Sequence, residues 1–335
     1  MPPSTAKEAA GPLRAGARRL LRAYRATGAD PVLGRPELAH GVPFEGYFWR
    51  IVDARGGIVV VALSAVCIGP DSRWGLSSLA VRPGRFARTV VTRTARADAG
   101  AFGVEAEDVL RGDPGALRVD MGPDARLDVT LEDRVSWAAR PFGALGVAHA
   151  VPWLPQYWHP VILSAAVRGR VHAGGLERRL DGATAYVEKN WGRGFPGRWW
   201  WGHAASFDDD VSVSFAGGRV RLAGTAVAPT AVVVRLGRRV LSFAPPAQRT
   251  RVRVGGDAWR LRTRGLGYAV DIDGAGDGAP QELLVPLPAE QRAEPHSRHH
   301  LAGELHLTVR RGRRLLYSGR SSLAGLEIGD SRTRA

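Results

Sequence analysis

One pattern constrains the fold of this chain more than any other. From about residue 40 onward, apolar and polar residues alternate in short runs that turn-forming residues interrupt. Phe44 to Ile51 and Ile58 to Ile68, on either side of the turn Asp53 to Gly57, show it best. Similar hairpins are expected at residues 118–131, 211–222 (with a Gly-Gly turn), 231–243 and 250–263. Many short strands at hairpin spacing predict antiparallel sheets closed into barrels, which can hold one small ligand inside.

The chain has 335 residues, enough for two domains of ordinary size. We expect an all-β fold with two antiparallel barrel or sandwich halves and a short N-terminal helix. A loop rich in Pro, Gly and aromatic residues, 141–160, breaks the strand rhythm and indicates a boundary near residue 150. The expected units are therefore a basic helix and linker at 1–35, one β domain at 36–150 and a second at 151–330. Residues 286–300, polar and proline-containing, are expected to form a loop.

Residues 8–27 carry the clearest helical pattern, with arginines around an apolar stripe of Leu13, Ala17, Leu20, Leu21 and Tyr24. Two interpretations stay open. The helix covers the main body, or it lies on an anionic lipid surface and assists access to a lipid substrate.

The formal net charge of +15 raises the question of a nucleic-acid partner. Arginine is scattered along every segment, however, and Lys7 and Lys189 are the only lysines. We therefore interpret the charge as an arginine bias on solvated faces and expect no nucleic-acid partner. Cys67 is the only cysteine, which excludes an intrachain disulfide and a cluster of thiolate metal ligands.

No apolar run is long enough to span a bilayer as a helix, and the N-terminus lacks a secretory pattern. We therefore expect a cytoplasmic protein. If the N-terminal helix lies on lipid, the protein would also contact the inner face of the membrane peripherally. His296, His299 and His300 fall in the expected polar loop without a Cys or a close Asp, so no metal site is expected.

The segment Ala185 to His203, AYVEKNWGRGFPGRWWWGH, stands apart from the rest of the chain. It holds four of the ten tryptophans, one of the two lysines and the only asparagine, Asn190. We expect strands at 184–190 and 198–207 joined by turns at 192–197. Alternation places Tyr186, Glu188 and Asn190 on one face of the first strand and Val187, Lys189 and Trp191 on the other. Which face points inward is left open.

Glu188 is the candidate acid of this segment. If it faces an aromatic interior, burial raises the pKa of its carboxyl, and a neutral carboxylic acid is a proton donor at neutral pH. Indole faces can stabilise a cation by about 0.5–2 kcal/mol each. Such a site could protonate an alkene and shelter the carbocation without a metal. The alternative is that the tryptophans form ordinary core and that Glu188 and Lys189 are surface charges.

The string YVEKNWGRGFPGRWWWGH resembles the signature of the tocopherol cyclase family. Pro43 to Tyr47 resembles the family's F-E-G-W-Y element, and Gln156 to His159 followed by Gly182-Ala183 resembles its approach to the signature. The resemblance covers roughly residues 40–330 and is strong at 185–203. It implies a calycin-type, lipocalin-like β fold for both halves. It also implies a cofactor-free reaction on a hydrophobic isoprenoid quinol: a prenyl double bond is protonated and a phenol captures the cation, closing a chromanol ring.

Carried over by position, the resemblance implies Glu188 as the acid, with Glu45 as the competing candidate, and Lys189 and Asn190 as groups that orient the substrate. The implied substrate pocket consists of Tyr47, Trp158, Tyr186, Trp191, Phe195, Trp199, Trp201 and His203. His203 stands where the family has glutamine, and Tyr47-Phe48 replaces Trp-Tyr. Both departures leave the head group of the substrate open. Two alternatives also stay open, a non-catalytic lipid or pigment carrier and a hydratase in which water captures the cation.

Overall fold

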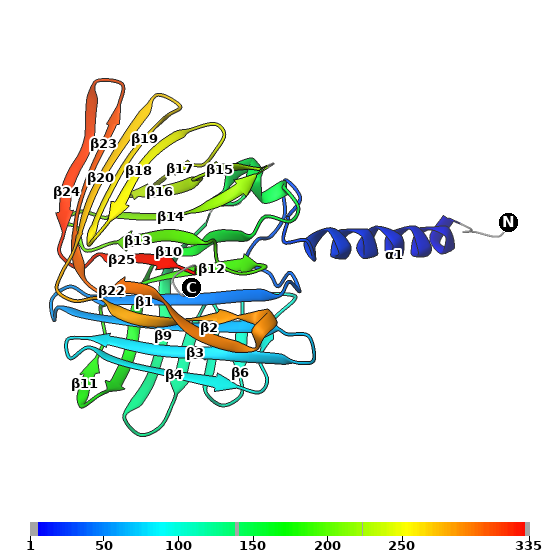
Figure 1. The fold of residues 1–335 in the computed structure, drawn as a ribbon, viewed down its shortest axis with the longest axis horizontal. Coiled ribbons are helices and arrows are strands. Elements are labelled where there is room, and N and C mark those ends of the chain that lie inside the picture. The colour runs from blue at the N-terminus through cyan, green and yellow to red at the C-terminus, as the bar shows by residue number, and fades with distance from the viewer. Residues whose placement is uncertain (1–5, 138–140, 223, 332–335) are drawn as a thin grey trace.

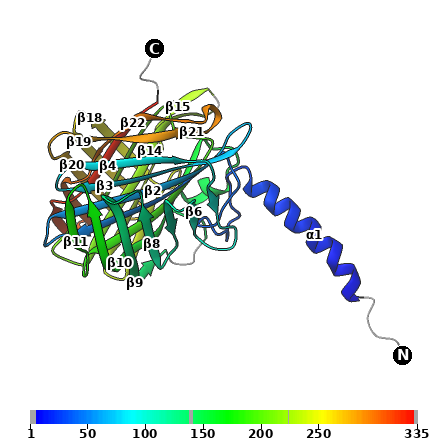
Figure 2. The same ribbon diagram turned by 90° about the horizontal axis from the view of Figure 1, so that it is seen from below.

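The computed structural model describes residues 6–137, 141–222 and 224–331, and the side chains of its single long helix from residue 15 onward. Leu13, in the expected apolar stripe, has its side chain outside the described residues. Helix α1 (Ala6–Arg25) projects away from a body made of antiparallel strands (Figures 1 and 2). No helix in the described part of the chain is long and apolar enough to cross a membrane.

The first half of the body is a twelve-stranded sheet with the order β4-β3-β2-β1-β12-β10-β9-β8-β7-β6-β5, and β11 pairs with β10. Trp49 on β1 packs edge-on against Phe102, which precedes β6, so the sheet curls and its distant strands share one core. The strands are β1 (Phe44–Asp53), β2 (Ile58–Ile68), β3 (Arg73–Arg82), β4 (Phe86–Thr92), β5 (Arg96–Ala97), β6 (Val104–Ala106), β7 (Leu110–Gly112), β8 (Ala116–Asp120), β9 (Ala125–Ser136), β10 (Gln156–Ala173), β11 (Leu176–Arg179) and β12 (Thr184–Gly192).

The second half contains an eight-stranded sheet, β17-β16-β14-β13-β25-β22-β21 with β15 beside β14, and a five-stranded sheet, β18-β19-β20-β23-β24. Trp200, Phe215, Trp259 and Leu307 belong to the core between them. The strands are β13 (Arg198–Ala204), β14 (Val211–Leu222), β15 (Thr225–Val227), β16 (Thr230–Leu236), β17 (Arg239–Phe243), β18 (Arg249–Gly255), β19 (Ala258–Gly265), β20 (Tyr268–Gly276), β21 (Gln281–Leu287), β22 (Arg292–His300), β23 (Gly303–Arg311), β24 (Arg314–Ser321) and β25 (Gly325–Asp330); short 3₁₀ helices occupy Gly146–Ala150 and Pro288–Glu290.

The two halves pack against each other through the outer faces of their central strands, β1 and β12 on one side and β13 and β25 on the other (Figure 1). Phe48 and Trp201, whose rings meet edge to face at 5.1 Å, lie at this contact. The expected all-β fold with two lipocalin-like halves is therefore confirmed. Residue 150 lies between β9 and β10 of one sheet, whereas the chain changes sheets after residue 192. The division into separate folding units at 36–150 and 151–330 stays a prediction.

Two local expectations were wrong. Residues 211–222 form the single strand β14, because Gly217 and Gly218 make room for the Trp200 indole and for Pro196 and do not form a turn. Residues 286–300 lie largely in the hairpin β21–β22, in which Leu283 pairs with Ser297, and do not form a polar loop. The strands expected at 184–190 and 198–207 are confirmed as β12 and β13; they belong to different sheets, because the turn between them crosses from the first sheet to the second.

Candidate active site

A cavity of about 560 Å³ lies between the two halves, outside both curled cores. Strands β1, β10 and β12 form one wall, β13, β14 and β25 another, the hairpin β21–β22 a third, and residues 145–158 lie at one end. The sequence predicted a ligand cavity inside a barrel, whereas this cavity lies between the two halves. Most lining residues are apolar or aromatic, and in the described wall the acidic side chains are Glu188 and Glu327, with no Lys, Arg or His.

Strand pairing explains why Glu188 faces this cavity. Partners in an antiparallel pair point to the same side of the sheet, and Glu188 is opposite Phe48 while Asn190 is opposite Gly46. All four line the cavity. Val187 and Lys189 point into the opposite face, toward the core of the first half. The alternation expected from the sequence is confirmed, and the open question of its direction is settled in favour of Glu188 and Asn190.

Glu188 is 3% exposed, and its carboxyl is held by three donors from both halves. The Trp158 indole N–H donates at 2.8 Å, the Tyr186 hydroxyl at 2.7 Å and the Trp201 indole N–H at 2.9 Å, all to Oε2. Among the described residues, no donor is within hydrogen-bond distance of Oε1. One oxygen is therefore fixed by the protein, and the other is free for a ligand in the cavity.

Burial raises the pKa of Glu188 to about 7, although the three hydrogen bonds oppose the shift. Desolvation disfavours the carboxylate more than these donors stabilise it. Nearby Glu327 raises this pKa further through its negative charge. Around neutral pH, a large fraction of the protein therefore carries a protonated carboxyl on the wall of an apolar cavity.

Glu327 on β25 is the second carboxyl of the cavity, and no motif in the sequence marks it as a site residue. It accepts hydrogen bonds from the Trp199 indole N–H at 2.6 Å and from His299 Nδ1 at 2.9 Å. Burial acts to raise its pKa, but hydrogen bonds and the interaction with His299 outweigh this and lower the pKa below its usual value. The two carboxyls therefore have opposite tendencies: Glu188 holds its proton and Glu327 loses it.

Asn190 presents an unsatisfied oxygen at the same wall. Its Oδ1 is buried, and among the described residues no donor lies within hydrogen-bond distance of it. Gly46 makes room for this amide, since a Cβ at residue 46 would lie 2.5 Å from Oδ1. A buried acceptor without a partner costs about 1–3 kcal/mol, which a ligand hydroxyl could offset.

The aromatic wall contains most of the expected pocket residues. Trp158, Phe195, Trp199 and Trp201 line the cavity, as does Tyr47, whose hydroxyl turns away toward Glu45 at 3.5 Å. Tyr186 and His203 do not line it. Tyr186 donates to Glu188 from the side, and the His203 ring stacks on Tyr186 at 4.0 Å. Burial, together with the charge of Arg50, lowers the pKa of His203 well below its usual value, so His203 is neutral and supports Tyr186.

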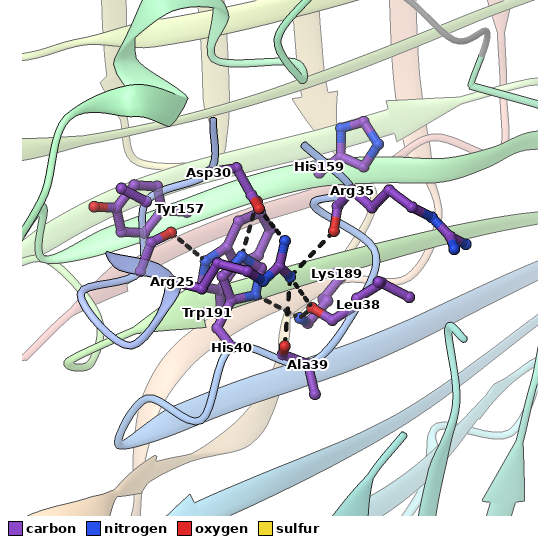
Figure 3. A network of polar contacts seen from close by, with 12 residues as sticks. Arg25, Asp30, Arg35, Leu38, Ala39, His40, Tyr157, His159, Lys189 and Trp191 are labelled. Atoms are coloured by element: carbon purple, nitrogen blue, oxygen red, sulfur yellow. Dashed lines mark hydrogen bonds and ion pairs between the residues drawn. The ribbon is translucent and has the colours of Figure 1, made fainter. Parts of the chain in front are cut away.

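Lys189 and Glu45 do not lie at the cavity, so their expected roles beside the substrate were wrong. On the opposite face of β12, Lys189 Nζ pairs with Glu45 Oε2 at 2.8 Å. The same ammonium donates to the Leu38 carbonyl at 2.6 Å and approaches His40 Nδ1 at 3.1 Å (Figure 3). His40 Nε2 in turn contacts Asp30 Oδ2 at 2.8 Å, and Asp30 pairs with Arg25. These contacts attach residues 25–45 to the first half.

Trp191 also lies on this opposite face, and its expected place in the substrate pocket was wrong. Its indole N–H donates to the Gly28 carbonyl at 2.8 Å, and its ring stacks on His40 at 4.5 Å and on Tyr157 at 5.5 Å. The Lys189 ammonium lies 4.8 Å from the Trp191 ring centroid, a cation–π contact. Trp191 and Lys189 therefore hold the N-terminal segment in place.

Comparison with known proteins agrees with this fold. The chain is 23% identical over 235 residues to the chloroplastic tocopherol cyclase of Zea mays; the match covers 66% of this chain but only 49% of the relative, about half its length. Two solved structures are similar in fold. CghA has a TM-score of 0.59 at 11% identity, with 88% of this chain and 90% of that chain covered. Kievitone hydratase from Nectria haematococca has a TM-score of 0.51 at 12% identity, with 86% and 89% covered.

The profile of the Tocopherol cyclase-like family matches residues 112–330, a range that contains β12, β13, β25 and both cavity carboxyls. Because this range is more than half of the chain, the protein belongs to the tocopherol cyclase-like family.

Proposed function

We propose that this protein is a cofactor-independent cyclase that protonates the prenyl double bond of an isoprenoid quinol and closes a ring onto its phenolic oxygen. One observation carries the proposal: Glu188 is a buried carboxyl with a raised pKa, and it faces an apolar, aromatic cavity. The family match and the maize relative named tocopherol cyclase support the same class of reaction. The cavity of about 560 Å³ is of a size that holds a small organic molecule.

The first step is proton transfer from Glu188. Since Oε2 accepts the three hydrogen bonds, the acidic proton resides on Oε1, which has no protein partner among the described residues. As this proton moves to a carbon of the double bond, negative charge develops on the carboxylate. The donors of Trp158, Tyr186 and Trp201 already point at Oε2, so they stabilise that charge without rearrangement.

The second step leaves a tertiary carbocation at the other alkene carbon. Trp199 and Trp201 line the cavity, and indole rings attract cations. Glu327 is ionised on the same wall and attracts the cation further. No Lys, Arg or His of the described lining opposes it.

The third step is capture by the phenol. The phenolic oxygen forms a C–O bond with the cationic carbon, and its proton returns to the Glu188 carboxylate. The substrate and product are isomers, and the acid is regenerated. Asn190 Oδ1 is the acceptor placed to hold the phenolic O–H before the attack. Holding both reacting ends in one cavity converts the ring closure into an oriented intramolecular step.

Incubation with a panel of prenylated hydroquinones in D₂O tests the proposal by mass spectrometry. A cyclised isomer should form with one non-exchangeable deuterium on the protonated carbon. Glu188→Gln should lower the rate by about 10²–10⁴-fold, the usual contribution of a general acid. The matched control Glu304→Gln, an exposed carboxyl on β23, should leave it unchanged.

Three results would contradict the proposal. Addition of one water would indicate a hydratase, recovery of the bound ligand unchanged would indicate a carrier, and full turnover by Glu188→Gln would show that this carboxyl is not the acid.

A further inference from the structure

The cavity opens beside the end of α1. Val147 and Val151 both line the cavity and are 48% and 45% exposed, so this stretch is part of the entrance. The same stretch is attached to the end of the helix. The Tyr24 hydroxyl donates to the Ala150 carbonyl at 2.7 Å, and the Trp153 amide donates to the Thr27 carbonyl at 3.2 Å. Helix α1, which projects away from the body (Figures 1 and 2), therefore ends beside the entrance.

Exposed apolar side chains are concentrated at this rim. Seven of the eleven large apolar side chains that are strongly exposed in the described part of the chain belong to α1, to the linker after it or to residues 147–153. A soluble surface rarely gathers such residues unless they mark an interaction site. These seven, which we call the entrance patch, are Leu20, Leu21, Val32, Leu33, Val147, Val151 and Trp153.

The charge next to the entrance patch is positive. Arg18, Arg19 and Arg22 are exposed on α1, and no Asp or Glu within the described residues pairs with them. Residues 15–25 and 141–155 contain no acidic residue at all. On the body the arrangement differs, since exposed arginines there commonly pair with carboxylates, as Arg260 does with Asp273 at 3.0 Å.

We propose that α1 and the entrance patch dock on the surface of an anionic lipid bilayer, so that the cavity opens toward the membrane. Arginines would lie at the phosphate level, with the leucines, the valines and the Trp153 indole inserted beneath it. Exposed Leu and Val beside the arginines favour lipid over nucleic acid, because a nucleic acid is bound through phosphate contacts and base stacking and does not bury aliphatic side chains. The proposal does not depend on the chemistry of the site, because docking can be measured without substrate.

Sedimentation of the full chain with vesicles tests the proposal. Vesicles of phosphatidylcholine with about 30% phosphatidylglycerol should bind the protein, and pure phosphatidylcholine should bind it weakly. The triple variant R18A/R19A/R22A should bind the anionic vesicles roughly 100-fold more weakly, since each arginine contributes about a factor of five. The control R249A/R251A/R253A removes three exposed arginines from β18, far from α1, and should bind as the wild type does.

A second pair of variants tests the apolar part. Trp153 (φ 64°) and Leu266 (φ 52°) are both exposed and both in the left-handed region, where Asn is well tolerated. W153N should weaken vesicle binding roughly tenfold, whereas L266N, in the turn between β19 and β20, should not.

If both triple variants lost vesicle binding equally, binding would depend on net charge alone, and the proposal would be overturned. It would also be overturned if W153N bound vesicles as the wild type does while single-stranded DNA bound tightly through the α1 arginines.

Discussion

Replacing Glu188 with Gln should change how the stability of the protein depends on pH. Burial raises the pKa of Glu188 to about 7 from its usual 4.5. The unfolded chain therefore loses this proton near the lower value, whereas the folded protein keeps it until the higher one. Between the two, the folded state binds the extra proton, so the free energy of unfolding falls as the pH rises. Gln is neutral throughout, and its amide oxygen can accept the same three hydrogen bonds.

The magnitude follows from the two pKa values. A single group changes stability by about 1.4 kcal/mol for each pH unit between them. Below the usual pKa of 4.5, the stabilising contribution of the Glu188 proton is fully present. This contribution is lost by the time the pH passes the pKa of about 7 in the folded protein. Between about pH 5 and about pH 8, ionisation of Glu188 should therefore lower the free energy of unfolding by roughly 2–3 kcal/mol. Asp30, whose pKa burial raises to about 6, titrates in the same range, but it is present in both proteins and cancels in the comparison.

Urea unfolding of both proteins at about pH 5 and about pH 8 measures this difference. From the lower to the higher pH, the free energy of unfolding of the wild type should fall by roughly 2–3 kcal/mol more than that of Glu188→Gln. Glu304→Gln, exposed on β23, is the control and should follow the wild type. Parallel pH profiles for the wild type and Glu188→Gln would mean that Glu188 is already ionised in the folded protein near pH 5. A neutral acid would then be absent from the cavity.

Three other variants separate the parts of the site. Trp201→Phe removes a donor that lowers the pKa of Glu188, so the pH above which catalysis declines should rise; an unchanged pH–rate profile would exclude this donor from the control of the acid. Lys189→Met leaves Glu45 buried without its cation and should cost about 3–5 kcal/mol in urea unfolding, with partial recovery when Glu45→Gln is added. Trp191→Phe should lower stability and leave KM unchanged, and a raised KM would return Trp191 to the substrate pocket.

Much of the first sheet could be predicted because its determinants are local. Alternation and turn chemistry indicate β1, β2, β8 and β9 within a few residues. They also indicate which residues share a face of β12. The prediction that Glu188 and Asn190 lie together was correct for this reason. Alternation places Lys189 and Trp191 on the face opposite Glu188, whereas the family resemblance implies one pocket for all three; the structure agrees with alternation.

The errors arise where partners are distant in sequence. Glu327 accepts a hydrogen bond from Trp199, which is 128 residues away in the sequence, and no local motif predicts this contact. Residues 286–300 contain prolines and many charges, which is typical of a loop, yet His299 is fully buried because its strand crosses the contact between the halves. The cavity itself is a product of packing between two sheets. Periodicity describes each strand and carries no information about which outer faces will meet.

Strand β12 explains why rare residue types adjoin one another in this sequence. It is a central strand with both faces buried, and each face has a different task. Toward the second half it presents Glu188 and Asn190 to the cavity; toward the first it presents Lys189 and Trp191 to the N-terminal segment. That segment continues into α1, at the entrance. A slip of one residue in the pairing of β1 with β12 would exchange the acid for the ammonium. The ion pair between Lys189 and Glu45 joins β12 to β1 in the register that keeps Glu188 at the cavity.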